Sequence, residues 1–199
     1  FADRIEVTLE PGNWLTIRDN GRGIPTDPHP KFPKLSALEV ILTTLHSGGK
    51  FSGKAYSTSG GLHGVGSSVV NALSERLEVE VARDRTLFTQ AFERGRPVTK
   101  LKNAGAVQNR RGTAIRFRPD PEIFGRQQFS AARLYRLCRS KAYLFRGVEI
   151  RWACDPALAG EEVPPQAVLH FPGGLSDFLA SAVEGRSAVV PSPFAGEAE

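Results

Sequence analysis

The sequence contains no methionine, only two cysteines, and no apolar run of the length that a membrane helix needs, about 18 residues or more. Cys138 and Cys154 are too few and too isolated for a disulfide framework or a structural zinc site, so we interpret both as small hydrophobic residues. The N-terminus has no charged, apolar, cleavable leader. These absences predict a soluble cytoplasmic protein with no membrane partner. The missing methionine also predicts that the chain is a piece of a longer protein.

The composition allows one large folded domain. The chain has 199 residues, 40% of them hydrophobic, and its 26 basic and 21 acidic side chains give a net charge of +5. Such a charge favours approach to nucleic acid or a polyphosphate, although many ordinary surfaces carry a similar excess. The last residues are small or proline and show little periodicity. We therefore expect one domain over residues 1–183, and a linker or the start of a following domain over 184–199.

Hydrophobic periodicity predicts a chain that mixes strands and helices. Alternation predicts a hairpin over 5–18 with its turn at 11–13, and further strands over 77–81, 87–93, 113–117, 148–152 and 163–171. Helical spacing predicts helices over 36–46, 65–73, 130–144 and 175–183. Ser36 and Glu39 form a capping box at the start of the first helix, and Ser130 caps the third.

Glycines are concentrated between residues 48 and 66, where seven of the chain's 20 are found. Residues 60–66 (GGLHGVG) open a predicted helix, and backbone amides without side chains at such an end suit an anion. A flexible loop with a helix cap explains this motif equally well when it stands alone. The Walker phosphate motif fails, because Thr44 and Phe51 occupy positions where it needs Gly and Ser or Thr. The Rossmann fingerprint fails because its third glycine is missing.

Asp19 closes the predicted hairpin and begins the sequence DNGRG. A carboxylate there can accept a hydrogen bond from the exocyclic amine of adenine, where guanine presents an oxygen, and so select ATP over GTP. Asp-Asn-Gly is also a strong turn signal, and turn chemistry explains it better in isolation. The glycine-rich motif further along the chain favours the nucleotide site. Lys50 would add a charge near the phosphates, with a solvated surface lysine as the alternative.

Three motifs resemble the ATPase domain of bacterial type II topoisomerases, the family of the gyrase B and topoisomerase IV B subunits. They are residues 19–25 (DNGRGIP), 45–51 (LHSGGKF) and 59–66 (SGGLHGVG), with later matches at 111–113 (RGT) and 171–175 (FPGGL). The resemblance runs from the first residue to about Leu179. The same GHKL superfamily contains HSP90-type chaperones, MutL-type repair proteins and histidine kinases. Residues 92–95, 139–144 and 147–150 resemble the topoisomerase IV protein more than gyrase B, which stays the alternative.

The resemblance implies the Bergerat fold, an α/β (α+β) sandwich in which a mixed, mainly antiparallel sheet carries helices on one face. It also implies ATP and Mg²⁺ as cofactors, with residues 46–66 as a lid over the nucleotide. The cofactor-binding residues that it implies are Asp19, Gly21, Gly23, Ile24, Pro25, Gly49, Lys50, Tyr56, Gly61, Leu62, His63, Gly64, Val65, Gly66, Ser67 and Thr113. Asp19 would contact adenine directly and Thr113 through water. The resemblance assigns His63 to backbone and lid contacts and gives it no role in acid/base catalysis.

The same resemblance implies partners. In this family ATP binding closes two copies of the domain, the B protein works with the A protein of topoisomerase IV or of gyrase, and one DNA duplex passes through a break in another. In this family, aminocoumarin-type inhibitors bind at a rim of the ATP site. Arg22, Ile24 and Pro25 resemble the residues of that rim. The family's glutamate general base and Mg²⁺-holding asparagine lie on a helix that would precede Phe1, and its γ-phosphate lysine would follow Glu199. We therefore expect no catalytic residue and no metal ligand in this chain, which binds ATP but hydrolyses it poorly or not at all.

A plain DNA-binding module is the alternative from another class of protein. Its basic residues would be Arg133, Arg136, Arg139, Lys141 and Arg146, on a predicted helix and its exit. A solvated helix face explains the same spacing, so the charges alone do not favour this function.

Overall fold

The structure is a computed structural model, and it describes residues 2–45, 65–185 and 196. The strands are β1 Arg4–Glu10, β2 Trp14–Asp19, β3 Pro28–His29, β4 Phe32–Ser36, β5 Ser74–Arg83, β6 Thr86–Glu93, β7 Arg96–Pro97, β8 Lys102–Ala106, β9 Gly112–Pro119, β10 Glu149–Cys154 and β11 Gln166–Leu169. The helices are α1 Ala37–Thr43, α2 Gly66–Ala72, α3 Pro121–Phe124, α4 Ala131–Leu144, α5 Pro156–Ala159 and α6 Leu175–Val183. All four predicted helices are present, and α1 ends a few residues earlier than predicted.

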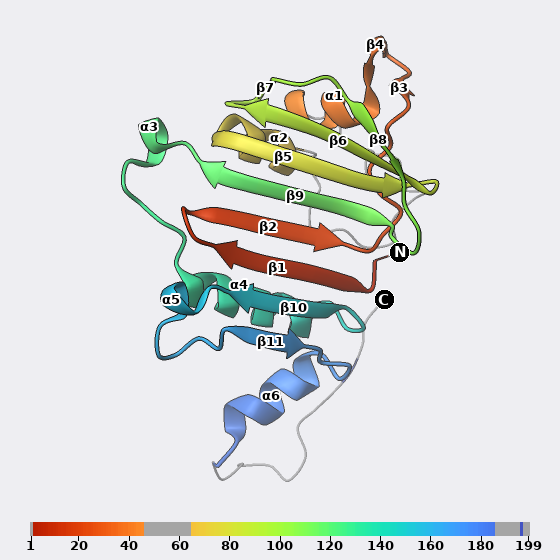
Figure 1. The fold of residues 1–199 in the computed structure, drawn as a ribbon. Coiled ribbons are helices and arrows are strands. Elements are labelled where there is room, and N and C mark those ends of the chain that lie inside the picture. Colours follow the sequence, from red (N-terminus) through yellow and green to blue (C-terminus); the bar gives the residue numbers. More distant parts are fainter. Residues whose placement is uncertain (1, 46–64, 186–195, 197–199) are drawn as a thin grey trace.

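A nine-stranded sheet forms the frame of the molecule (Figure 1). Its strands follow the order β11, β10, β1, β2, β9, β5, β6 and β7, and β8 pairs with β6 off this path. Within the described residues β1 and β10 run parallel, while the other pairs are antiparallel. The sheet is therefore mixed and mainly antiparallel, which confirms the predicted fold class.

Helices α1, α2 and α4 cover one face of this sheet and lie behind it in Figure 1. One apolar cluster joins β1, β2 and β10 to α4, with Leu15, Trp152 and Ala142 among its buried residues. A second cluster joins α1 to β5 and β6. Phe117 of β9 packs against both clusters, so they form one continuous layer between helices and sheet. Among the described residues, no helix has the length and apolarity to span a bilayer.

The two cysteines belong to this apolar layer. Cys138 of α4 and Cys154 of β10 are both buried, and neither forms a disulfide. Burial raises the pKa of the Cys138 thiol to about 11, so the reactive thiolate is scarce at neutral pH. Both residues behave as small hydrophobes, as predicted from the sequence.

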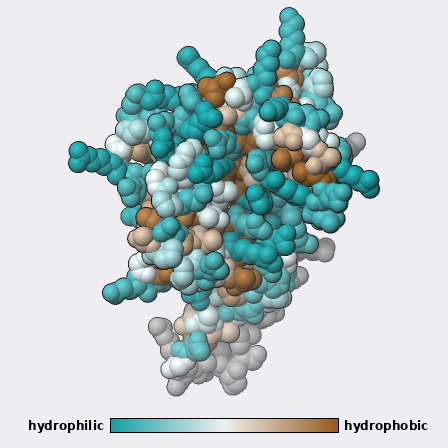
Figure 2. Space-filling model, in the orientation of Figure 1, coloured by the Kyte–Doolittle hydropathy of each residue, from teal (hydrophilic) through white to brown (hydrophobic). Residues whose placement is uncertain are grey.

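The opposite face of the sheet, called the open face below, carries alternating arginines and glutamates. None of the described helices covers it in Figure 1, and Figure 2 shows mainly hydrophilic residues on it. Ion pairs join the strands there: Arg116 of β9 reaches across β2 to Glu10 of β1 at 2.8 Å, and Arg76 of β5 pairs with Glu93 of the neighbouring β6 at 2.8 Å. Exposed pairs of this kind add little stability individually. The open face is therefore a solvated, charged surface.

One ion pair that lies away from this face connects a buried carboxylate to the β6–β7 turn. Asp120 is 2% exposed, accepts a hydrogen bond from Arg94 Nε at 2.5 Å, and caps α3 through the Glu122 N–H at 2.9 Å. The Arg94 hydrogen bond, followed by the Glu122 N–H, holds the pKa of the Asp120 carboxyl below its usual range. A depressed folded-state pKa gives stability above the ordinary aspartate pKa of about 4, and this stability is lost as the pH falls further.

We therefore expect Asp120→Asn to lower the free energy of unfolding most at neutral pH. The difference from the parent chain should shrink as the pH falls below about 4, because the parent carboxyl is then protonated as well. Urea unfolding at a series of pH values measures this difference. Asp27→Asn, at an exposed position, is the control. A difference between Asp120→Asn and parent that stays constant over the whole pH series would contradict the assignment.

Candidate nucleotide-binding site

Asp19 is the last residue of β2 and lies one residue beyond the Arg18–Ala114 pair that links β2 to β9. Side chains alternate along a strand, so Asp19 shares the helix-covered face with buried Leu15. Its Oδ1 accepts a hydrogen bond from the Gly21 N–H at 2.7 Å. Within the described residues its Oδ2 accepts none. The turn chemistry and the nucleotide function that the sequence suggested for Asp19 are therefore compatible, because each uses a different oxygen.

Positions 21 and 23 require glycine, because neighbouring atoms leave no space for a Cβ there. A Cβ on Gly21 would lie 2.8 Å from Asp19 Oδ1, so any larger residue there displaces the carboxylate. Gly23 has a φ of +76°, and a Cβ on it would lie 3.0 Å from Val81 Cγ1 and 3.1 Å from the Ala82 carbonyl oxygen. Only glycine meets both demands without strain. The two glycines therefore fix the position of the carboxylate and of the chain that leaves it.

Thr113 lies beside Asp19 at the start of β9. The register between β2 and β9 places it opposite Asp19, one residue past the last Cα pair. Thr113 is buried, and its Oγ1 accepts a hydrogen bond from the Ile24 N–H at 3.1 Å. The hydroxyl proton remains available as a donor. Ile24 packs against the second apolar cluster, whereas the next predicted site residue, Pro25, is exposed. Asp19, Gly21, Gly23, Ile24 and Thr113 thus come together.

Two residues of this arrangement were not among the predicted site residues. Gly112 has a φ of +104°, and a Cβ on it would lie 2.0 Å from the Asp19 carbonyl oxygen. Its RGT motif was visible in the sequence, but nothing showed that the two backbones touch. Arg83 donates a hydrogen bond from Nη1 to the Gly23 carbonyl at 3.1 Å, across 60 residues of chain. No local sequence signal points to that contact, since it depends on how β5 lies beside the loop.

The remaining predicted site residues lie at or before α2. Val65 is the N-cap of α2 without a side-chain hydrogen bond, and Gly66 and Ser67 begin the helix. Because α2 covers the face toward which Asp19 points, both parts of the predicted site share one side of the sheet. The other predicted residues, Gly49, Lys50, Tyr56, Gly61, Leu62, His63 and Gly64, lie outside the described residues. That Asp19 and the start of α2 face one cavity stays a prediction.

In the part of the chain that the structure describes, no group of three or more His, Cys, Asp or Glu side chains is placed to hold a metal ion. Among the described residues, the site offers a carboxylate oxygen, a threonine hydroxyl and the backbone of a glycine turn.

A sheet covered by helices on one face, with a carboxylate at the end of an inner strand beside a buried threonine, is the architecture of a nucleotide-binding α/β domain. Residues 1–123 match the family model described as histidine kinase-, DNA gyrase B- and HSP90-like ATPase. The chain belongs to this family.

Several relatives are similar over the whole chain. The B subunit of DNA topoisomerase 4 from Caulobacter vibrioides is 56% identical over 200 residues, which cover 100% of this chain and 29% of the relative. The corresponding protein of Bartonella bacilliformis is 53% identical over 202 residues, with the same coverage. That of Haemophilus influenzae is 44% identical over 198 residues, 99% of this chain and 30% of the relative. The chain thus spans about three tenths of the length of these relatives.

A solved structure confirms the fold. The 43K ATPase domain of Thermus thermophilus gyrase B, in complex with an aminocoumarin, has a TM-score of 0.79 and 35% sequence identity. The similarity covers 98% of this chain and 47% of that chain. Fold class and family, both expected from three short motifs, are therefore confirmed. The named relatives agree with the preference for topoisomerase IV over gyrase.

Proposed function

We propose that this chain is the ATP-recognition part of a type II DNA topoisomerase, in the B protein of the topoisomerase IV kind, with gyrase B as the second candidate. The observation that carries the proposal is the Asp19 carboxylate, which is held by Gly21 through one oxygen and keeps the other available beside Thr113. The B proteins of DNA topoisomerase 4, similar over the full chain, support the choice of parent enzyme.

Base recognition follows from hydrogen-bond polarity. Asp19 Oδ2 accepts a hydrogen bond from the exocyclic amine of adenine, and the Thr113 hydroxyl donates to the same region through a water molecule. Guanine presents an oxygen at that position, which would leave two acceptors opposed. A hydrogen bond to a charged group contributes about 1.5–3 kcal/mol, so the site discriminates ATP from GTP by roughly tenfold to a hundredfold.

The phosphates are proposed to lie at the start of α2. Val65, Gly66 and Ser67 would contact them there, together with Gly61, Leu62, His63, Gly64, Gly49 and Lys50, while Tyr56 lies near the base. Mg²⁺ has no ligand set among the described residues, so we assign it no step and place its ligand in the parent enzyme outside this chain.

The general base is also proposed to come from the parent enzyme, on a helix that precedes the first strand. Apolar side chains on the described part of the helix-covered face support this proposal. Ile17 of β2 and Val69 of α2 are each 40% exposed although they are apolar and lie on the covered side. Leu73, Phe117 and Phe129 line an apolar hollow of about 290 Å³ on the same side. A further apolar helix packed there would bury these side chains.

The parent enzyme's further properties belong to the same proposal. Residues 1–183 form the ATPase domain, and 184–199 are a linker or the start of the transducer domain. ATP binding would close two copies of the domain, with the A protein of topoisomerase IV or gyrase as partner and DNA strand passage as the coupled step. The rim at Arg22, Ile24 and Pro25 is proposed to bind aminocoumarins. The enzyme would act in the bacterial cytoplasm, where its DNA substrate lies.

Ligand binding and turnover together test this proposal. The 199-residue chain should show a higher thermal midpoint with a non-hydrolysable ATP analogue, and also with the aminocoumarin novobiocin. An analogue at about 100 times its Kd adds about 2.7 kcal/mol to the stability of the folded state. Steady-state ATP hydrolysis should be slow or undetectable, because no described residue takes the role of the general base.

A GTP analogue at the same concentration is the control and should shift the midpoint much less. The proposal fails if neither the ATP analogue nor novobiocin stabilises the chain. Hydrolysis at the rate of the intact B protein would contradict the placement of the general base outside the chain.

A further inference from the structure

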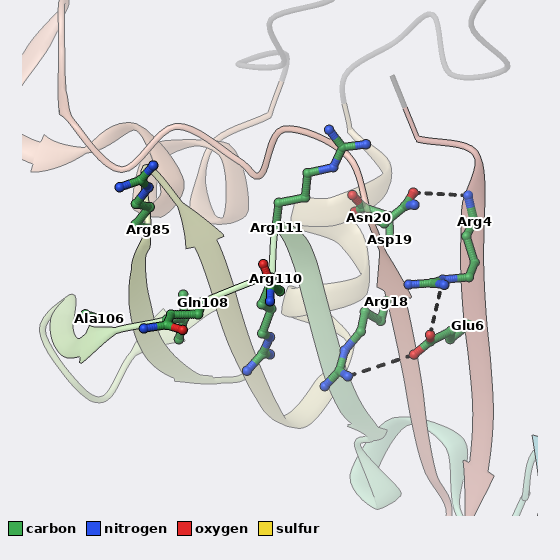
Figure 3. Close-up of a pocket in the computed structure, with 12 residues that line it drawn as sticks. Arg4, Glu6, Arg18, Asp19, Asn20, Arg85, Ala106, Gln108, Arg110 and Arg111 are labelled. Carbon is green, nitrogen blue, oxygen red and sulfur yellow. Dashed lines mark hydrogen bonds and ion pairs between the residues drawn. The ribbon is translucent and has the colours of Figure 1, made fainter.

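Asn20 follows Asp19 directly and joins the end of β2 to the start of β1 (Figure 3). Its side-chain oxygen accepts hydrogen bonds from the N–H groups of Asp3 and Arg4, at 3.1 and 3.0 Å. Its side-chain amide donates to Asp3 Oδ1 at 2.6 Å, and its backbone N–H donates to the Arg4 carbonyl at 3.2 Å. Four hydrogen bonds therefore hold this half-buried residue against the segment that opens β1.

The orientation of the Asp19 carboxylate depends on how the chain turns after β2. Among the described residues that carboxylate bonds only to the Gly21 N–H, so the position of Gly21 sets the direction of the free oxygen Oδ2. The register of β2 against β1 ends at Asp19, opposite Ile5, before Gly21 is reached. Asn20 continues the connection to β1 beyond that point. Its hydrogen bonds therefore fix the turn that orients the carboxylate.

A connection of this kind positions a loop only if its other end is fixed. The Asp3 carbonyl accepts a hydrogen bond from the Glu149 N–H at 2.8 Å, and Arg4 pairs with Glu149 in the parallel ladder of β1 and β10. On its other side the loop lies against Gly112, where a Cβ would lie 2.9 Å from the Asn20 Cα. The turn is thus held between the start of β1 and the start of β9.

We propose that Asn20 is a positioning residue for adenine recognition, because it holds the turn in which Gly21 directs Asp19 Oδ2 toward the base. The inference rests on the proposed function, since it gives Asn20 a part in the base discrimination described there. Asn20 belongs to the DNGRG motif but was not among the predicted site residues, and its side chain bonds to the start of β1. Loss of this contact should weaken ATP binding and spare GTP, because guanine does not use the hydrogen bond to Asp19.

The hydrogen bond between Asn20 and Asp3 involves a charged acceptor. It holds the pKa of the Asp3 carboxyl below its usual value, and the charges of Arg111 and Arg4 act in the same direction. The Asn20 oxygen is held by two backbone N–H groups, so the plane of its side chain is fixed. A carboxylate in place of the amide would keep these two hydrogen bonds and oppose a second negative oxygen to Asp3. The contact can therefore be weakened without losing the backbone hydrogen bonds.

Titration of Asn20→Ala with non-hydrolysable analogues of ATP and GTP tests the proposal on the 199-residue chain. The Kd for the ATP analogue should rise at least about tenfold, and the Kd for the GTP analogue less than about threefold. A merely structural role would weaken both alike, so the ratio of the two Kd values is the decisive readout. Asn103→Ala is the matched control. It removes the same side chain, whose oxygen accepts the Gly105 N–H at 2.9 Å, from an exposed position on β8, and it should leave both Kd values unchanged.

The Asn20→Asp variant is expected to bind the ATP analogue in a pH-dependent way. Two carboxylates at the 2.6 Å that separates the Asn20 amide nitrogen from Asp3 Oδ1 cannot both stay ionised, so the pair takes up a proton as the pH falls. Arg4 and Arg111 favour the ionised forms and move this uptake to lower pH. The Kd of the variant, divided by that of the parent at the same pH, should be at least about threefold at about pH 8 and approach one at about pH 5. This division removes the titration of the analogue's own phosphates.

The double variant Asp3→Asn/Asn20→Asp exchanges donor and acceptor and keeps the net charge. It should bind the ATP analogue within about threefold of the parent over the same pH range. The inference is overturned if Asn20→Ala keeps the parent ratio of ATP to GTP affinity, or if the double variant binds as weakly as Asn20→Asp at about pH 8. If Asn20→Ala does not fold, the pH series of Asn20→Asp decides, and a ratio of one throughout overturns the inference.

These outcomes are distinct from failure of the proposed function. A parent chain that does not bind the ATP analogue overturns the proposed function and this inference with it. A parent chain that binds the ATP analogue, with variants that keep its affinity and its preference over GTP, overturns the role of Asn20 alone.

Discussion

The Asp19→Asn variant is expected to bind a non-hydrolysable ATP analogue about 100-fold more weakly, or worse, while its fold is unchanged. In the parent chain Asp19 Oδ1 accepts a hydrogen bond from the Gly21 N–H at 2.7 Å. Asn keeps an oxygen that can accept this hydrogen bond, so the turn remains closed. Its amide NH₂ then replaces Oδ2 and faces the amine of adenine with a second donor. The lost charged hydrogen bond costs about 1.5–3 kcal/mol and the opposed donors about 1–3 kcal/mol more. Together these terms, about 2.5–6 kcal/mol, correspond to roughly sixtyfold to twenty-thousandfold in Kd.

Isothermal titration of the parent and variant chains with the analogue measures this loss, and the unfolding midpoint without ligand checks the fold. Glu161→Gln is the control, because it exchanges a carboxylate for an amide at an exposed position. It should leave the Kd unchanged. If Asp19→Asn binds within about threefold of the parent, less than about 0.7 kcal/mol is involved and Asp19 does not recognise the base.

Local signals in the sequence were sufficient for much of the fold. Ser36 caps α1 as the capping-box pattern predicted, with its hydroxyl accepting the Glu39 N–H at 3.1 Å. The first hairpin turns at Gly12 and Asn13, both with positive φ, which is where Pro-Gly-Asn had placed the turn. In these cases the residues that determine the structure are neighbours in the chain. Composition and spacing then carry the information directly.

Other elements depend on contacts between distant residues and could not be predicted. Every residue of β8 is exposed, so no alternation marks it, and it exists because its backbone pairs with β6. The β3–β4 hairpin is mostly exposed as well. The parallel pairing of β10 with β1, which joins Arg4 to Glu149, brings together the two ends of the domain. Strand propensity identifies such segments at best, and the partner is decided by tertiary packing.

Some residues of the candidate site could likewise be predicted from the sequence, and others could not. Asp19, Gly21 and Gly23 were visible as a contiguous motif, and Thr113 entered through the family resemblance. Arg83 could not be found, because its contact with the Gly23 carbonyl depends on the position of β5.

The Gly112→Ala variant is expected to have a much lower free energy of unfolding than the parent chain. Gly112 has a φ of +104°, where an alanine costs about 1–3 kcal/mol of backbone strain. The new Cβ would also lie 2.0 Å from the Asp19 carbonyl oxygen, in the middle of the contact between β9 and the end of β2. Relief requires the two strands to separate, and overpacking of this kind costs about 1–3 kcal/mol or more. The total, about 2–6 kcal/mol, is a large part of the stability of an ordinary domain.

The chain contains a matched control at Gly105 of β8. Gly105 has nearly the same φ, +106°, but a Cβ on it would meet nothing within 4 Å. Gly105→Ala therefore carries the backbone strain without the collision, and urea unfolding of both variants separates the two terms. Gly112→Ala should be less stable than Gly105→Ala by at least about 1 kcal/mol. Equal losses would mean that β2 and β9 adjust freely around Asp19. In that case the carboxylate would not be held rigidly enough for the base discrimination proposed above, because a site that yields to a methyl group also yields to the wrong base.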